Sequence, residues 1–107
     1  MGFFSDDSAH ADAYNQVTTD QNKNSWTPEL VGSAAAYEAS KKYDDHAEQY
    51  GAPASLADAK HLIAGLAGVA ADGLLETKGI DFIDKARTRD EAAKQAADAY
   101  DGGGEGF

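Results

Sequence analysis

Apolar residues recur at helical spacing along most of this chain, and the clearest such stretch is residues 28 to 50. Thr27 suits the N-cap position and Pro28 the first helical position, so the helix begins there. Gly51 follows as a stop signal, and the helix is expected to end near Tyr50. Its apolar seam follows a 4-3-4-3-4 spacing through Gly32, Ala36, Ala39, Tyr43, His46 and Tyr50.

A second long helix is predicted after a short connection, "GAPA". Ser55 is its expected N-cap, and the helix runs to about Lys78 before stopping at Gly79. The short connection makes the two long helices, residues 28 to 78, an antiparallel hairpin. The seam of the second helix is expected at Leu56, Ala59, Ile63, Leu66, Ala70 and Gly73.

Shorter elements flank this hairpin. Residues 5 to 20 carry a weak apolar face and predict a short helix, and the polar segment "QNKNSW" that follows it predicts a linker. Residues 80 to 100 predict a last helix with an apolar stripe, and "DGGGEGF" at 101 to 107 predicts a flexible tail. The stripe is expected at Phe82, Ile83, Ala86, Ala93, Ala97 and Tyr100.

These elements predict an all-α fold: a small bundle built on the central hairpin, in one domain of residues 1 to 100. With 107 residues and alanine as the commonest side chain, the core should be thin and formed by close helix approach. A second subunit covering one face would add burial. We therefore expect a homo-oligomer, in the first instance a dimer formed through the alanine and glycine faces.

The charge balance is strongly acidic and narrows the range of partners. The chain has 19 acidic and 9 basic residues, and a field of that sign repels phosphate backbones, which disfavours nucleic acid. The basic cluster "KARTR" at 85 to 89 reads as a solvated helix face. The chain contains no cysteine and begins without a signal-peptide pattern, so a cytoplasmic protein is expected.

The segment "HLIAGLAGVAADGLLETKG" raises the question of a ligand surface. Its uncharged run, residues 62 to 71, is too short to span a bilayer, which takes about 20 residues. His61, Gly65, Gly68, Asp72 and Glu76 share one face of the predicted helix. Another helix packed on the glycines would explain them. The alternative is a flat cofactor such as haem, bound by Gly65 and Gly68 with His61 as axial ligand.

Two histidines suggest a further alternative at the end of the hairpin. The antiparallel geometry places His46 and His61 at similar heights, with Asp44, Asp45 and Glu48 nearby, so a divalent metal could be bound there. The competing interpretation is that His46 packs between Tyr43 and Tyr50 while the carboxylates are solvated. His10, on the N-terminal helix, is expected to be exposed.

Catalytic motifs are missing from the sequence. The glycines fall inside a helix with no strand before them, which argues against a phosphate-binding loop, and there is no nucleophile elbow around a serine. Asp81 and Asp84 suit a helix start as well as they suit chemistry. We therefore assign no catalytic residue and predict no cofactor in the main interpretation, and a non-enzymatic protein is favoured.

Four segments together resemble a known family: "MGFFSDDS…AYNQV", "ELVGSAAAYEASKKYDDH", "AKHLIAGLAGVAAD" and "ETKGIDFIDKA". In order and spacing they resemble the fungal CipC-like antibiotic-response proteins (concanamycin-induced protein C and relatives), over roughly residues 1 to 98. The resemblance implies a small intracellular protein linked to antibiotic or stress exposure. It implies no activity and no catalytic residue.

The sequence thus supports two hypotheses of different class. The first is a small acidic stress-response protein that acts through protein–protein contacts or self-association. The second is a carrier or sensor that binds haem or a divalent metal with His61 and His46.

Overall fold

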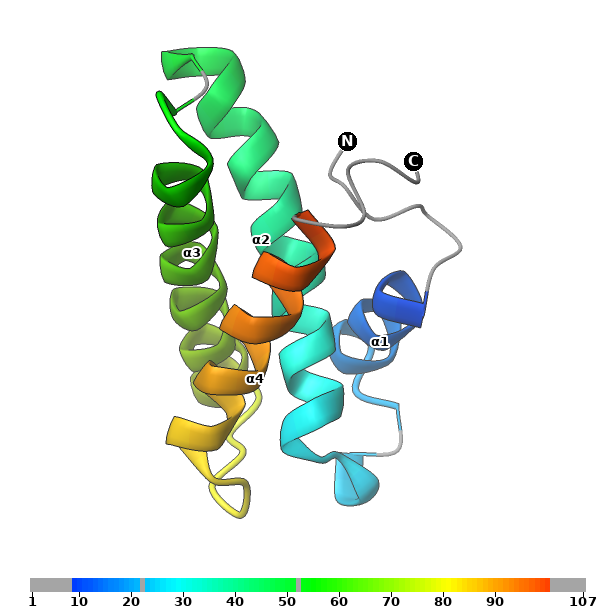
Figure 1. Cartoon of the computed structure of the whole chain (residues 1–107). Helices are drawn as coiled ribbons and strands as arrows, with labels where there is room; N and C mark the ends of the chain where they lie inside the picture. The colour runs from blue at the N-terminus through cyan, green and yellow to red at the C-terminus, as the bar shows by residue number, and fades with distance from the viewer. Residues whose placement is uncertain (1–8, 22, 52, 101–107) are drawn as a thin grey trace.

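The computed structural model describes residues 9–21, 23–51 and 53–100, and these form helices with no strand (Figure 1). The fold confirms the all-α prediction. The predicted tail at 101 to 107 and the first residues of the predicted N-terminal helix lie outside the described residues. The elements are α1 (Ala9–Thr18), a 3-10 turn η1 (Lys23–Ser25), α2 (Pro28–Tyr50), α3 (Leu56–Thr77) and α4 (Lys85–Asp98).

The two long helices begin where their capping residues predict. The Thr27 side chain accepts a hydrogen bond from the Leu30 backbone N–H at 3.1 Å, and Ser55 does the same for Asp58 at 3.1 Å. Each cap satisfies one of the amides that a helix start leaves without a partner. At the other end of α2, Gly51 adopts φ +85, a left-handed value that favours glycine. Local capping chemistry therefore fixes the hairpin.

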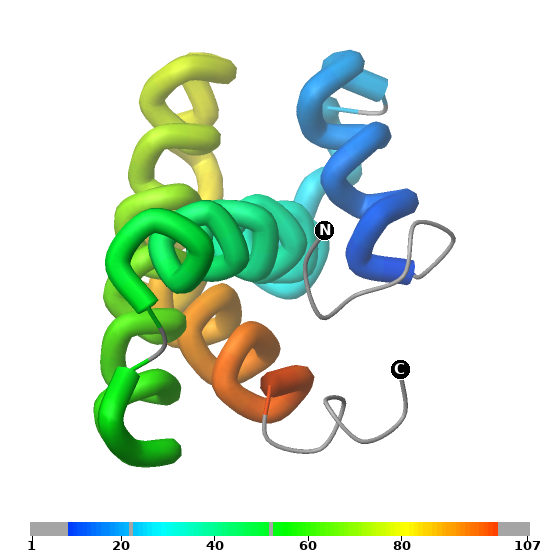
Figure 2. The backbone as a smooth tube through the Cα atoms, turned by 90° about the horizontal axis from the view of Figure 1, so that it is seen from above, coloured from blue at the N-terminus to red at the C-terminus, as the bar shows by residue number. Residues whose placement is uncertain are grey.

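The shorter helices pack on different sides of the hairpin. α4 lies against both α2 and α3, whereas α1 packs on α2 (Figure 1). Seen from above, α2 is surrounded by α3, α4 and α1 (Figure 2). α2 is consequently the central helix, and its buried residues run through most of its length. The core is rich in alanine; its larger members are Val17, Trp26, Val31, Tyr37, Tyr43, Ile63, Leu74, Leu75, Ile80 and Ile83.

Close approach between α2 and α4 depends on one glycine. A Cβ added at Gly32 would lie 2.8 Å from the Glu91 Cβ and 3.1 Å from the Ala92 backbone nitrogen. Neither atom is at the end of a flexible side chain, so α4 would have to move. The thin, closely packed core that the alanine content predicts is thus present at this contact.

The last helix differs from its prediction. Helix α4 begins only at Lys85, after Asp84, whose side chain accepts a hydrogen bond from the Arg87 N–H at 3.0 Å. The predicted stripe through Phe82 was wrong at that residue, because the Phe82 side chain is 57% exposed. The predicted stripe also lies on the wrong side of α4. Ala86 is exposed, and the residues that α4 buries are Thr88, Ala92 and Ala96. In a helix so rich in alanine, the apolar pattern alone does not identify the buried side.

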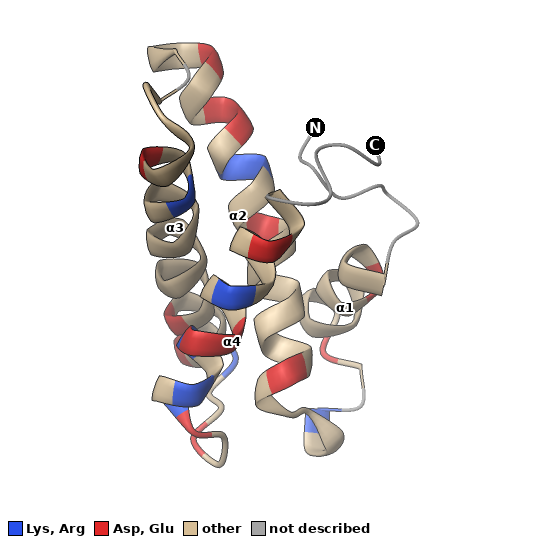
Figure 3. Cartoon of the chain, in the orientation of Figure 1, with Lys and Arg blue, Asp and Glu red and all other residues tan. Residues whose placement is uncertain are grey.

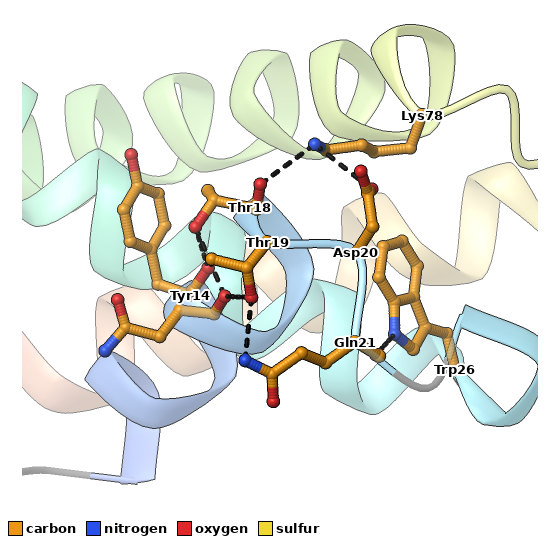
Figure 4. Close-up of polar contacts among 8 residues, drawn as sticks. Tyr14, Thr18, Thr19, Asp20, Gln21, Trp26 and Lys78 are labelled. Atoms are coloured by element: carbon orange, nitrogen blue, oxygen red, sulfur yellow. Dashed lines mark hydrogen bonds and ion pairs between the residues drawn. The ribbon is translucent and has the colours of Figure 1, made fainter.

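The predicted linker "QNKNSW" is also more structured than expected. It contains η1, and Trp26 is buried, with its indole Nε1–H donating a hydrogen bond to the Gln21 carbonyl at 2.8 Å (Figure 4). Trp26 precedes the N-cap Thr27, and Val31 lies five residues later in the same core. This is the spacing of a hydrophobic staple, which sets the angle at which a chain enters a helix.

Candidate functional site

The face of α3 predicted to carry a ligand is divided into two parts by α4. Gly68 is buried, and a Cβ at this position would lie 3.8 Å from the Arg89 Nε atom of α4. Gly65 is exposed, and no described atom lies within 4 Å of the position where its Cβ would be. His61 is exposed as well. A neighbouring helix therefore accounts for Gly68 but leaves Gly65 open.

The covered part is held by ion pairs from α4 to both helices of the hairpin. Arg89 Nε lies 3.5 Å from Asp72 Oδ2 of α3, and Arg87 forms an ion pair with Glu29 of α2. Between these arginines, Thr88 is buried and its hydroxyl donates to the Asp84 carbonyl at 2.7 Å. The "KARTR" cluster is thus more than a solvated face: its arginines are half exposed, but they connect three helices.

The contact between α4 and α2 also changes the pKa of Glu29. Its pKa is lowered, first by a hydrogen bond from its own backbone N–H at the start of α2, and further by the Arg87 guanidinium. A shallow hollow of about 310 Å³ lies beside Arg89, lined mostly by small residues of α3 and α4: Ala64, Gly68, Ala86, Asp90 and Ala93. Asp72, which pairs with Arg89 through Oδ2, has its other carboxylate oxygen, Oδ1, buried without a hydrogen-bond partner among the described residues.

The two histidines of the metal hypothesis have different surroundings. The His46 ring is half-buried and lies 4.9 Å from the ring of Tyr50, one of the two tyrosines of the packing interpretation. Its Nδ1 atom is buried and has no partner among the described residues. In that part of the chain no three His, Asp or Glu side chains gather closely enough to hold a metal ion. A site based on His46 and His61 would therefore need ligands from water or from another molecule.

The open part of α3 borders an apolar groove between the hairpin helices. Val69 is 72% exposed, and Gly73, one turn further along, is exposed with no described atom within 4 Å of its Cβ position. The groove has a volume of about 530 Å³. It is lined by α3 residues and by α2 side chains at its rim: Leu66, Val69, Ala70, Gly73, Leu74, Thr77, Glu38 and Lys42, with Thr18 and Lys78 at one end.

One end of this groove is closed by a contact that also fixes α1. The Lys78 ammonium group donates to the Thr18 carbonyl at 3.1 Å and lies 3.1 Å from Asp20 Oδ1 (Figure 4). Lys78 follows α3 directly and Thr18 ends α1, so the ends of these two helices are tied together. This contact and the packing of α1 on α2 dock α1 on the hairpin.

A second link to α1 involves residues that sequence reasoning missed. His10 was expected to be exposed, but it is half-buried, and its Nε2 lies 2.9 Å from Gln95 Oε1 of α4. The same oxygen accepts a hydrogen bond from the Ser33 hydroxyl of α2 at 2.6 Å. Gln95 therefore joins three helices. Burial lowers the pKa of His10, and the hydrogen bond to Gln95 partly opposes that effect.

Two tyrosines connect α2 with the end of α4. The rings of Tyr43 and Tyr100 are 5.4 Å apart in an edge-on arrangement, and their hydroxyl oxygens are 3.4 Å apart. Burial, together with the hydrogen bond and charge of Tyr100, raises the pKa of Tyr43 to about 12. The Tyr43–Tyr100 contact thus links α2 to the residues that follow α4.

Acidic side chains occur on each of the four α-helices, as Figure 3 shows. Residues Leu62 to Ala71 of α3 carry no charge, and Gly65 and Val69 are the exposed members of this stretch. No helix among the described residues is long and apolar enough to cross a membrane. The site is thus an apolar helix face on an otherwise acidic molecule.

The sequence of the chain matches a known family. A family model described as "Virulence factor CipC-like" matches residues 13–102. The chain belongs to the CipC-like family. The resemblance noted in the sequence is confirmed, and the family suggests a protein associated with the antibiotic response. Neither a curated protein nor a solved structure matches the chain.

The matched region of this CipC-like chain includes nearly all of the features described above. It contains α2, α3 and α4 in full, together with the open α3 surface and both histidines of the ligand hypothesis. His10 lies before the matched residues. The family therefore covers the groove, whereas the link from His10 to Gln95 joins a residue outside the match to one inside it.

Proposed function

We propose that this CipC-like chain is a small, non-enzymatic protein of the antibiotic or stress response, which acts in the cytosol through protein–protein contacts. The contact surface that we assign is the open part of α3 beside the groove. The chain contains no cysteine, which is compatible with a reducing compartment such as the cytosol and supports this location.

The observation that carries this proposal is the position of Val69. Its side chain is 72% exposed, in a stretch without charges, and it lies one turn from Gly65 and one turn from Gly73, which both have open space beside them. Each glycine costs an isolated helix about 1 kcal/mol relative to alanine. Close approach by another backbone is a usual reason for such a cost, and an exposed apolar side chain gives that backbone something to bury.

The polar groups elsewhere support the non-enzymatic interpretation. Thr27, Ser55 and Asp84 cap helices, while Gln95 and Lys78 join helices to each other. Each therefore has a role in stability. A catalytic site needs polar groups that converge on a cleft with a proton donor or nucleophile in reach of a substrate, and the groove beside Val69 is lined mainly by apolar and small side chains.

The proposal is tested in cells of the source organism that produce a substituted protein in place of the original. Val69→Asp should abolish the contribution of the protein to antibiotic tolerance without lowering its abundance. Tyr50→Asp is the matched control, because Tyr50 is 71% exposed but lies at the end of α2. Equal tolerance in the two variants would contradict the proposed surface. Turnover of a metabolite that a single His or carboxylate substitution abolishes would contradict the non-enzymatic assignment.

A second candidate function is a haem- or divalent-metal-binding carrier, and the buried Nδ1 of His46 is the observation that favours it. A bound ion would satisfy that atom. In this alternative His46 and His61 hold the metal, or His61 ligates haem over Gly65 and Gly68. The purified protein would be titrated with Zn²⁺ by calorimetry and with haem by absorbance in the Soret region. Binding that His61→Ala abolishes, while the fold persists, would support this candidate. Equal binding in wild type and variant would eliminate it.

A further inference from the structure

The open surface of α3 has the shape of one half of a helix–helix contact. We define the α3 face as Leu62, Gly65, Leu66, Val69 and Gly73. Each of them lies three, four or seven residues from Val69 or is Val69 itself, so they share one side of the helix. Gly65, Val69 and Gly73 are exposed, and the two leucines are half-buried.

The same face provides both a protruding side chain and a recess that fits one. Leu66, Val69, Ala70 and Gly73 occupy positions i, i+3, i+4 and i+7, the four positions that form a hole in knobs-into-holes packing. All four line the groove, and Gly73 widens it because it has no Cβ. Val69, with most of its side chain in solvent, is a knob of suitable size. A face that carries both parts is complementary to itself.

We propose that the α3 face binds the α3 face of a second copy of this chain, with the helices antiparallel and the two-fold axis passing beside Val69. This inference rests on the proposed function, because it names the partner of the same surface. A two-fold axis at Val69 places Gly65 of one copy opposite Gly73 of the other, since each lies four residues from Val69. Two positions without a side chain then meet, and the two backbones approach closely.

Charge supports the antiparallel orientation. His61 lies eight residues before Val69 and Glu76 lies seven residues after it. With the axis at Val69, His61 of one copy therefore stands beside Glu76 of the other, on the same side of the pair. A parallel pair would instead place Glu76 beside Glu76, which is repulsive. Because both His61 and Glu76 are exposed, each has room to reorient toward its counterpart.

The contact also explains how so acidic a chain can pair with itself. Residues 62 to 71 carry no charge, so the centre of the proposed interface brings no like charges together. The charged side chains are held at the rim by intrachain contacts, with Lys42 3.8 Å from Glu38 and Lys78 beside Asp20. Repulsion between two chains of net charge −10 acts at longer range and is screened by salt.

A disulfide test locates the axis directly, because the chain has no cysteine of its own. In an antiparallel pair crossing at Val69, the two copies of Val69→Cys come within disulfide reach, and mild oxidation should join them as a covalent dimer. Tyr50→Cys, equally exposed but off the α3 face, is the control. Rapid dimer formation in Val69→Cys alone supports the inference. Equal rates for the two variants would overturn it.

A charge exchange tests the orientation. His61→Glu should weaken the dimer roughly fivefold, since it loses an exposed pair and adds a repulsion. Adding Glu76→Lys to His61→Glu should restore the original affinity. The two positions are separated by about 22 Å along one helix, so they cannot compensate within one chain. Failure of the second substitution to restore the affinity would overturn the antiparallel register.

These results separate the inference from the proposed function. If the wild type stays monomeric and yet Val69→Asp cells lose antibiotic tolerance, the second copy is the wrong partner and the contact surface stands. If the protein forms the Val69→Cys dimer and yet Val69→Asp cells keep full tolerance, the dimer stands and the proposed function fails.

Discussion

Two pairs of glycines in the same hairpin have opposite surroundings. On the side facing α4, Gly32 and Gly68 meet neighbours, and the Cβ position of Gly32 is only 2.8 Å from the Glu91 Cβ. On the open side, Gly65 and Gly73 meet no described atom within 4 Å. Packing within the chain therefore explains the first pair. The second pair costs helix stability without any compensation that the described chain provides, and this difference leads to a surface that a second molecule covers.

The largest effect on stability should come from adding a methyl group at Gly32, on the side of the hairpin that α4 covers. We expect Gly32→Ala to destabilise the fold by about 2 kcal/mol, because the new methyl group pushes α4 away and overpacking outweighs the gain in helix propensity. Chemical denaturation measures the change. A stabilised Gly32→Ala protein would show that α4 does not pack as closely as described.

The matched substitutions on the open side should have the opposite sign. Gly65→Ala and Gly73→Ala should each stabilise the isolated chain by about 1 kcal/mol, since a methyl group there meets open space. Denaturation at low protein concentration, where the chain is monomeric, measures this gain. The same substitutions should weaken self-association, which sedimentation at high concentration detects. Loss of stability in the monomer would mean that these positions are already covered.

A smaller effect concerns the pH dependence of the free energy of unfolding, through His10 at its contact with Gln95 of α4. Because burial lowers the pKa of His10 in the folded protein, the unfolded chain binds a proton more readily than the folded one. Stability contributed by neutral His10 is therefore complete above its unfolded pKa of about 6.5 and falls as the pH drops below that value. Between about pH 7 and pH 5.5, the free energy of unfolding of His10→Gln should therefore fall less steeply than that of the wild type. The same slope in variant and wild type would assign the dependence to another group. Carboxylates such as Glu29, whose pKa is lowered, lose their contribution at more acidic pH.

The hairpin could be predicted from the sequence because its signals are local. Thr27 and Ser55 cap the two long helices, and Gly51 is suited by its left-handed φ to end the first. The all-α fold follows from the same signals. For the flanking helices such signals are weaker, and alanine occurs on both buried and exposed sides of α4. The buried phase of α4 depends on contacts between distant segments, which the sequence pattern does not contain. Trp26 had a local signal, since it precedes the N-cap Thr27 and lies five residues before Val31, the spacing of a hydrophobic staple.

The candidate site was predictable in part. The sequence singled out the glycines of α3, and the structure divides them between a covered and an open side. It did not single out Val69, because one valine among alanines and glycines gives no separate signal. It also missed the link between His10 and Gln95, which joins residues 85 positions apart. The ligand roles of His46 and His61 stay predictions.

The central claim is that the α3 face binds a second copy of the chain, and sedimentation velocity of the wild type, Val69→Asp and Tyr50→Asp tests it most directly. Samples would span about 1 μM to about 500 μM at physiological salt. The account predicts a concentration-dependent dimer for the wild type and Tyr50→Asp, and roughly hundredfold weaker association for Val69→Asp, whose carboxylate would be buried at the axis. A wild-type monomer at every concentration, or a Val69→Asp protein that dimerises like the wild type, would contradict it.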